Sequence, residues 1–166
     1  MNAIDKDTVT LELAGASVTI SAAVLAELWL DKLRGKPAGV TGPEPRIGAA
    51  LDGGIYAGIA RGENGQPDHH LILLDEAPKR LSWKKALEWA KSIGADLPTR
   101  SESALLYANL RDLFQTDWWY WTSTQSAGDE AYAWIQDFDF GDQIIDRKGD
   151  DYRARAVRRV PFTTEG

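Results

Sequence analysis

Acidic and aromatic side chains are interleaved through residues 129–151, a combination that favours ligand binding over any one reaction. The segment holds eight Asp or Glu and two Lys or Arg residues, so its net charge of −6 equals that of the whole chain. Aromatic rings cover a flat apolar ligand face, while carboxylates accept hydrogen bonds from hydroxyl groups or attract a cation. A solvated acidic strand edge that discourages sheet pairing is the alternative explanation. We favour recognition of a sugar ring, a cationic group or a protein surface.

Tryptophan is concentrated at the same place, since four of the seven Trp residues fall within positions 118–134. Trp118 and Trp119 are consecutive, so one of them must face outward or toward a neighbouring element. Trp121 is expected to fill the core between a strand and a helix. The candidate ligand-binding residues are therefore Trp118, Trp119, Tyr132, Trp134, Asp137, Asp139, Phe140, Asp142 and Asp146.

Catalytic and metal chemistry find little support in the sequence. The absence of Cys excludes disulfides, thiolate ligands and Cys nucleophiles, and the adjacent His69 and His70 would point to opposite faces of a strand. Asp137 and Asp139 resemble a glycosidase pair, but a segment with eight acids produces such pairs by chance. With Asp142 they offer oxygen ligands for calcium, without the spacing of an EF-hand. We expect no enzyme activity and no cofactor, and calcium remains an alternative.

Arginine is clustered near the end of the chain. A basic patch for an anionic sugar or a phosphate is one interpretation, but we favour ion pairs with acidic residues upstream. Arg100 is likewise expected to bind loop carbonyls or a carboxylate. The clustered residues are Arg153, Arg155, Arg158 and Arg159.

The sequence predicts a small N-terminal element and one larger domain. Residues 8–20 suggest two short strands around Gly15, and Ser21 is placed to cap a helix that runs to about Leu33. Six Gly or Pro residues then occur between positions 35 and 45, which is typical of a linker. We predict these segments: residues 1–36 as an attachment or oligomerisation element, 37–45 as the linker, 46–160 as the main domain and 161–166 as a tail.

The main domain should contain a hairpin, two helices and then several strands. Ile55, Ala57 and Ile59 alternate before a turn at residues 62–65, and an apolar strand returns over residues 70–74. Ser82 is predicted to cap a helix that ends at Gly94. This order, with helices between groups of antiparallel strands, indicates an α+β fold.

The second helix and the late strands complete the predicted domain. Ser101 is expected to cap a helix without the acidic partner of a full capping box. Its inward residues are predicted to be Leu105, Leu106, Ala108, Leu110 and Leu113. The strands are expected at residues 119–124, 131–138, 144–145 and 153–160.

Several motifs between residues 53 and 160 resemble the phage and prophage DUF1566 family, whose fold is a variant of the C-type lectin fold. The most specific are Leu97-Pro98-Thr99-Arg100, Tyr120-Trp121-Thr122-Ser123 and Arg155-Ala156-Val157-Arg158-Arg159. Such domains occur on phage tail fibres, receptor-binding proteins and bacterial adhesins. The variable proteins of diversity-generating retroelements are relatives and often trimerise. The enzymatic, formylglycine-generating branch depends on cysteines, so its activity does not transfer to this chain.

The expected fold is thus α+β and C-type-lectin-like, with two helices packed on antiparallel sheet and a small N-terminal hairpin and helix. The resemblance implies a non-enzymatic phage or prophage tail domain that recognises a host receptor. Its expected partners are a host cell-surface glycan or protein, other phage tail proteins and two further copies in a homotrimer. A structural virion component and a carbohydrate-active enzyme are the alternatives.

Charge and the N-terminal residues bear on location. An acidic chain disfavours binding to nucleic acid and to anionic membranes. We see no signal peptide and no apolar run of membrane-spanning length. The expected location is the virion, after synthesis in the bacterial cytoplasm.

Overall fold

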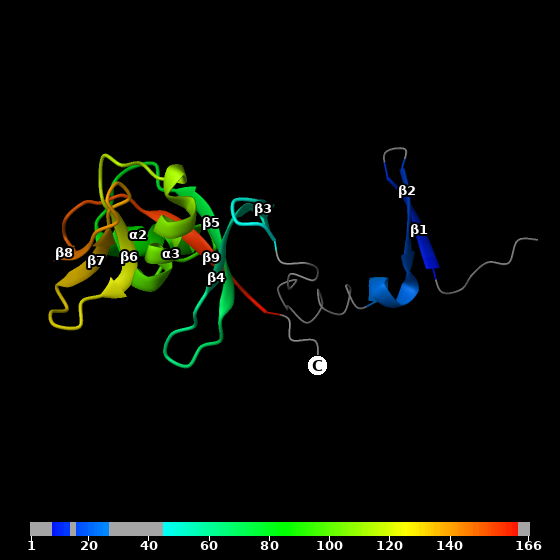
Figure 1. The fold of residues 1–166 in the computed structure, drawn as a ribbon, viewed down its shortest axis with the longest axis horizontal. Helices are drawn as coiled ribbons and strands as arrows, with labels where there is room; N and C mark the ends of the chain where they lie inside the picture. The colour runs from blue at the N-terminus through cyan, green and yellow to red at the C-terminus, as the bar shows by residue number, and fades with distance from the viewer. Residues whose placement is uncertain (1–7, 14–15, 27–44, 163–166) are drawn as a thin grey trace, which may run out of the picture. The chain divides into compact units, whose positions relative to one another are not determined.

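The computed structural model describes residues 8–13, 16–26 and 45–162 (Figure 1). The chain divides into two compact units, residues 1–40 and 41–166, and each is described by itself. Most of the predicted linker, the predicted helix beyond residue 26 and the tail beyond residue 162 lie outside the described residues.

The first unit contains the predicted hairpin and the start of the predicted helix. Strand β1 (Thr8–Leu13) pairs antiparallel with β2 (Ala16–Ser21). The hydroxyl groups of Thr10 and Thr19 lie 3.1 Å apart across the two strands. Residues 22–26 are helical, and the Ser21 hydroxyl accepts a hydrogen bond of 3.2 Å from the backbone N–H of Val24. Ser21 therefore starts the helix as predicted.

The larger sheet of the second unit brings the first and last strands of the domain together. Its order is β3-β4-β5-β9, with every neighbouring pair antiparallel. The strands span Ala50–Leu51 (β3), Gly54–Ala60 (β4), His69–Glu76 (β5) and Arg155–Pro161 (β9). The predicted hairpin is formed by β4 and β5, so this part of the prediction is confirmed.

The smaller sheet carries most of the predicted ligand-binding segment. Its order is β6-β7-β8, again antiparallel throughout. Strand β6 spans Tyr120–Gln125, β7 spans Tyr132–Gln136 and β8 spans Gln143–Arg147. Strand β7 ends before the predicted Phe138 because the chain turns at Asp137. Two antiparallel sheets, with the helices between their strands along the chain, confirm the α+β class.

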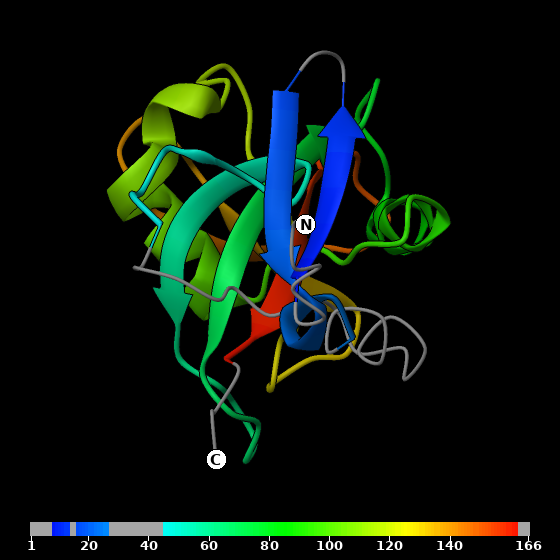
Figure 2. The same ribbon diagram turned by 90° about the vertical axis from the view of Figure 1, so that its right-hand side faces the viewer.

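Two helices lie on different sides of the larger sheet (Figure 2). Helix α2 (Trp83–Ser92) packs near β6, whereas α3 (Arg100–Leu110) packs on β4, β6 and β7 and continues into a 3₁₀ turn, η1 (Arg111–Leu113). Ser82 occupies the N-cap position of α2 as predicted, although its side chain makes no capping hydrogen bond. Gly94 follows the α2 C-cap with φ +71, which matches the prediction. In the described part of the chain, none of the helices has the length and apolar character that crossing a membrane requires.

The start of α3 differs from the prediction. Thr99, not Ser101, is the N-cap residue, and its side chain accepts a hydrogen bond from the backbone N–H of Glu102. The Glu102 carboxylate in turn accepts from the Thr99 N–H at 2.8 Å, which completes a capping box. The prediction was wrong by two residues because Thr99 was assigned to the preceding loop. The correct motif is Thr99-x-x-Glu102.

Two apolar clusters form the core. Leu106 and Leu110 of α3 pack with strands of the larger sheet, and Ala86 and Ala90 of α2 pack with Trp121 of β6. The Trp121 side chain is fully buried, which confirms its predicted place in the core. The smaller sheet therefore contributes to both clusters, because its Tyr120 belongs to the first and its Trp121 to the second.

Two residues that were predicted to face inward, and one residue of the predicted strand alternation, face solvent. Ile59 is 41% exposed because a β-bulge between Tyr56 and Gly58 shifts the alternation of β4. Ala108 lies on the exposed side of α3, and Leu113 is exposed because the chain changes from α-helix to 3₁₀ turn at Arg111.

Candidate functional site

A loop pinned by a buried carboxylate joins β7 to β8. The Asp137 side chain is 8% exposed and accepts hydrogen bonds from the backbone N–H groups of Asp139, at 3.1 Å, and Phe140, at 2.7 Å. The Asp137 N–H donates to the carbonyl of Asp142 at 2.9 Å and closes the loop. Asp137 therefore orders the loop from inside, whereas Asp139, Phe140 and Asp142 are exposed.

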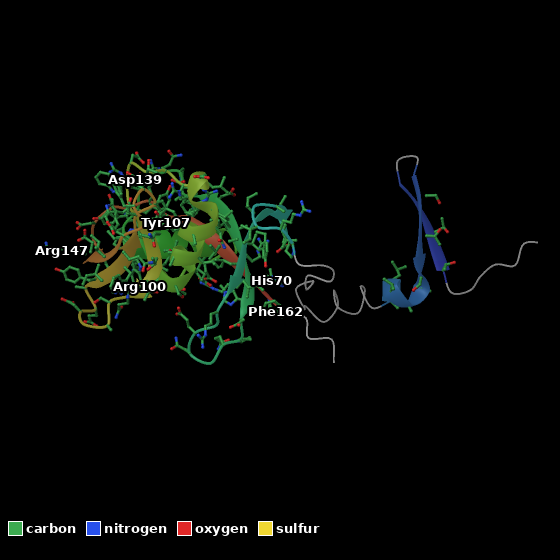
Figure 3. All side chains as sticks on the ribbon, in the orientation of Figure 1. His70, Arg100, Tyr107, Asp139, Arg147 and Phe162 are labelled. Carbon is green, nitrogen blue, oxygen red and sulfur yellow. The ribbon has the colours of Figure 1, made fainter. Side chains whose placement is uncertain are left out.

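Phe140 stands out on this loop because its side chain is 80% exposed. The next residue, Gly141, has φ +88, a backbone conformation that residues other than glycine rarely adopt. A Cβ atom at Gly141 would lie 2.6 Å from the Tyr107 ring, so the loop rests directly on α3. Figure 3 shows Asp139 at one edge of the domain, away from His70 on β5 and from Phe162, which follows β9.

A hollow of about 320 Å³ adjoins the loop. Its wall includes Trp118, Trp119, Asp137 and Tyr152, so three predicted residues meet here. Trp118 is 41% exposed, while Trp119 is half-buried against the second core cluster. This confirms that one of the two consecutive tryptophans faces outward. The Trp118 indole N–H donates to the Asp151 carbonyl at 3.3 Å, which fixes the ring.

Basic side chains border the other side of Trp118. The Arg80 guanidinium lies 4.4 Å from the centre of the Trp118 ring, and Lys79 and Arg80 line a separate, neighbouring hollow of about 550 Å³ that shares Trp118 and Asp117 with the first. Arg153, also in this wall, binds Asp117 through two nitrogens and Glu76 at 2.8 Å. The Arg153 guanidinium lowers the pKa of Asp117 despite the opposing effect of desolvation.

The outer face of β7 carries two further predicted residues. The Arg100 guanidinium lies 3.5 Å from the centre of the Trp134 ring and donates to the Gln143 side chain at 3.0 Å. Arg100 therefore covers an aromatic ring and binds the amide oxygen of a strand side chain, rather than the loop carbonyls or the carboxylate that were predicted. The Tyr132 hydroxyl accepts a hydrogen bond of 3.4 Å from Arg147 on β8.

Asp146 lies on the edge strand β8 and is half-buried, so it belongs to the sheet rather than to the loop. Its carboxylate accepts a short hydrogen bond from the Tyr152 hydroxyl, and the Tyr152 ring packs edge-on to Trp121 at 5.0 Å. Burial raises the pKa of Tyr152, and the Asp146 carboxylate raises it further, so the phenol remains protonated. The predicted residues thus divide into an exposed group at the loop and hollow, and a group that supports the β7–β8 sheet.

The late arginines mainly form ion pairs, as predicted. Arg158 binds Asp52 at 2.9 Å, and Arg159 binds Asp96 at 2.9 Å. Arg155 is the exception, since it donates to the backbone carbonyls of Leu74 and Leu113. Burial lowers the pKa of Arg155, although nearby acidic groups oppose this effect.

A buried ionic cluster around Glu102 was missed from the sequence. The Glu102 side chain is 2% exposed and accepts hydrogen bonds of 2.7 Å from both Nε and Nη2 of Arg159. His69 Nε2 lies 2.8 Å from the same carboxylate, and the Thr99 N–H completes the set. Burial acts to raise the pKa of Glu102, but Arg159, Thr99 and His69 outweigh burial and hold it below its ordinary value. The Thr99-x-x-Glu102 spacing was the available signal.

The cluster also explains two of the motifs quoted above. Arg159 Nη2 donates to the Leu97 carbonyl at 3.2 Å, and Asp96 forms backbone bridges with Val157. The Leu97–Arg100 motif and the Arg155–Arg159 motif therefore meet in space. The contacts between these motifs hold α3 and β9 together. Neither motif belongs to the exposed loop between β7 and β8.

Comparisons with protein-family models and with curated proteins give no match to this chain. Within the described ranges, no group of three or more His, Cys, Asp or Glu side chains is arranged to hold a metal ion. The candidate site consists of the loop ordered by Asp137, the exposed Phe140 and the adjoining hollow lined by Trp118 and Trp119.

Proposed function

We propose that residues 46–160 form a C-type-lectin-like recognition domain of the DUF1566 kind, carried on a phage or prophage tail. The pairing of β5 with β9, the two helices between them and the separate β6-β7-β8 sheet support this fold. The motifs quoted from the sequence support the family. The first unit would attach the domain to other tail proteins or to sister chains in a homotrimer.

The observation that carries the proposed binding role is the exposure of Phe140 on an ordered loop. Burying a phenylalanine side chain is worth roughly 1.5–3 kcal/mol, which this protein forgoes at Phe140. The loop is held by two hydrogen bonds to Asp137 and by contact with Tyr107, so little conformational entropy remains to be lost on binding. A ligand that covers Phe140 would gain the free energy of burying its ring and lose little conformational entropy in the loop.

The surroundings of Phe140 favour a host cell-surface glycan. Asp139 and Asp142 lie on the same loop as Phe140 and have exposed carboxylates, which can accept hydrogen bonds from hydroxyl groups. Asp137, which orders the loop, also lines the hollow beside Trp118. Aromatic faces for the apolar side of a sugar ring and carboxylates for its hydroxyl groups thus lie on one surface. A protein receptor would use the same side chains as a paratope does.

We propose binding without catalysis. Glu102 and Asp137 are the two carboxylates buried in the described part of the chain. Glu102 accepts four hydrogen bonds from Arg159, Thr99 and His69, and each oxygen of Asp137 accepts one from the backbone of its own loop. Both carboxylates therefore hold their own elements in place, whereas a general base needs an oxygen placed against the substrate proton.

The experiment is binding of the full chain to intact cells from a panel of bacterial strains and to their extracted surface polysaccharides. Wild type is compared with Phe140→Ala and Trp118→Ala, and Ile93→Ala serves as a matched control because Ile93 is also 41% exposed but lies beyond α2. Binding that is lost only in the first two variants supports the proposal. Binding equal in all four proteins, or binding to purified tail proteins alone, contradicts it. Release of sugar fragments would indicate an enzyme instead.

A further inference from the structure

A second hollow, of about 340 Å³, lies between the β4–β5 hairpin and the start of α3. In the common view of Figures 1 and 3, this hairpin lies at the bottom of the domain and Asp139 at the top. The hollow is therefore separate from the loop surface proposed above. Its volume falls at the lower end of the range for small-molecule sites.

The floor of this hollow is the saturated cluster of Glu102, Arg159 and His69. The side chains of these residues are 2%, 29% and 13% exposed, and their mutual hydrogen bonds of 2.7–2.8 Å fix their positions. Buried ion pairs are costly to desolvate, so they add little net stability compared with apolar packing. Their value here is that they present a rigid polar floor, which is what a binding site needs.

Hydrogen bonds order the turn of the β4–β5 hairpin, which forms the rim of the hollow. Asp68 accepts a hydrogen bond of 2.9 Å from the Gly62 N–H, and the Gln66 N–H donates to the Glu63 carbonyl at 3.0 Å. The Ser101 hydroxyl on α3 binds the Glu63 carboxylate, which ties the hairpin to the helix.

Three polar side chains line this rim. Within residues 45–162, Arg61, Asn64 and Gln66 have no side-chain hydrogen bond or ion pair. The hairpin therefore holds free donors and acceptors at the mouth of the hollow, although the backbone that carries them is fixed.

The charges around the hollow select against an ion. Arg61 and Arg159 are balanced by Glu63 and Glu102, so neither an anion nor a cation gains a net attraction. Arg61 offers only donors, the Glu63 carboxylate only acceptors, and the amides of the rim offer both. A neutral molecule rich in hydroxyl groups needs this mixture.

Apolar rings complete the wall. Pro67 and Pro161 line the same hollow, together with the half-buried His69 ring. A sugar ring has a flat face of C–H groups and a rim of hydroxyl groups, and so it fits a site with apolar rings and mixed hydrogen-bonding side chains. We infer that this hollow binds an uncharged sugar residue. The inference does not rest on the proposed role of Phe140.

The test is a titration of the isotopically labelled full chain, followed through its amide NMR spectrum. The probes are glucose, galactose and N-acetylglucosamine, with glucuronate and glucosamine as charged counterparts. We expect the neutral sugars to shift the amides of residues 62–69 and 99–102, and the charged ones to bind more weakly. Arg61→Ala should weaken binding about tenfold, since hydrogen bonds from a charged donor are worth roughly that factor or more.

Two controls keep the test decisive. Gln66→Ala provides a second variant at the rim, and Arg46→Ala removes an exposed arginine outside the hollow and should leave binding unchanged. The same spectra report whether each variant is folded. No shift with any neutral sugar, or a shift with glucuronate alone, would overturn the inference. Shifts confined to residues 137–142 would overturn it while supporting the loop surface.

Discussion

At the scale of single residues, the proposed binding role of the loop depends on one carboxylate. The Asp137 carboxylate accepts hydrogen bonds from the backbone N–H groups of Asp139 and Phe140. The substitution Asp137→Ala removes both hydrogen bonds. We expect a loss of about 1–2 kcal/mol in the free energy of unfolding and a marked loss of ligand binding. Asp137→Asn keeps one acceptor oxygen and should show smaller losses in both. Chemical denaturation and binding of the same proteins check this, and an Asp137→Ala protein that binds normally would contradict it.

A second residue-scale prediction concerns pH. The pKa of Glu102 in the folded protein lies below its ordinary value of 4.5. The ionised Glu102 carboxylate therefore stabilises the folded protein fully at pH values above 4.5, and this stabilisation is lost as the pH falls through the lowered pKa of the folded state. Glu102→Gln lacks it and leaves Arg159 partly buried without its main partner, at a cost of roughly 3 kcal/mol near neutral pH.

The measurement is denaturation of wild type and Glu102→Gln at several pH values. The difference between their unfolding free energies should be largest at neutral pH and shrink in acid. Lys84→Gln, on the solvent face of α2, is a control with a side chain 87% exposed and should show no such trend. A difference that stays constant with pH would refute the role given to Glu102.

At the scale of elements, the loop between β7 and β8 depends on α3 as its support. Gly141→Ala would place a Cβ atom 2.6 Å from the Tyr107 ring and impose a side chain at φ +88. The expected cost is about 1–2 kcal/mol from the backbone conformation alone, with a further cost from the clash. Binding through Phe140 should weaken as the loop moves.

A double variant separates these two effects. Gly141→Ala combined with Tyr107→Ala removes the clash but keeps the strained backbone, so it should recover part of the lost binding. Gly149→Ala is a control, because a Cβ atom there meets nothing within 4 Å. Equal binding by Gly141→Ala and wild type would show that the loop does not need this support.

Most elements were predictable because their patterns are local. The hairpin of β4 and β5, the helix from Trp83 and the late strands all follow from periodicity and turn residues. The errors have physical causes outside that pattern: the bulge at Gly58 changed the facing of β4, and the Thr99–Glu102 capping box moved the start of α3.

The site was only partly predictable. Aromatic and acidic residues near the loop could be selected by composition, and the structure places Trp118, Trp119 and Asp137 around one hollow. The different roles of Asp137, Asp139 and Asp146 depend on which oxygen meets which N–H or hydroxyl group, which no spacing reveals. The Glu102–Arg159 pair joins residues 57 positions apart, beyond the reach of any local pattern.

At the scale of the whole molecule, we expect the second unit to fold without the first. Its last strand, β9, pairs with β5 of the same unit, and both core clusters consist of residues from the second unit. A fragment of residues 41–166 should therefore melt cooperatively within a few degrees of the full chain. Thermal denaturation checks this, and a fragment without a cooperative transition would contradict the division into units.

The assembly predicted from the family resemblance is tested with the same two proteins. If residues 1–36 hold sister chains together, the full chain should have the mass of a trimer in solution and the fragment that of a monomer. Light scattering after size-exclusion chromatography measures both. A full chain that remains monomeric at high concentration would exclude the proposed trimer.

In the proposed function, Phe140 and its ordered loop form the ligand contact. The most direct measurement compares the dissociation constants of wild type, Phe140→Ala and Ile93→Ala for extracted bacterial surface polysaccharide. An aromatic anchor at the centre of an interface is worth about 2 kcal/mol or more, so Phe140→Ala should bind roughly 30-fold more weakly. Ile93→Ala should bind as wild type does. Equal dissociation constants for wild type and a folded Phe140→Ala protein would contradict the claim.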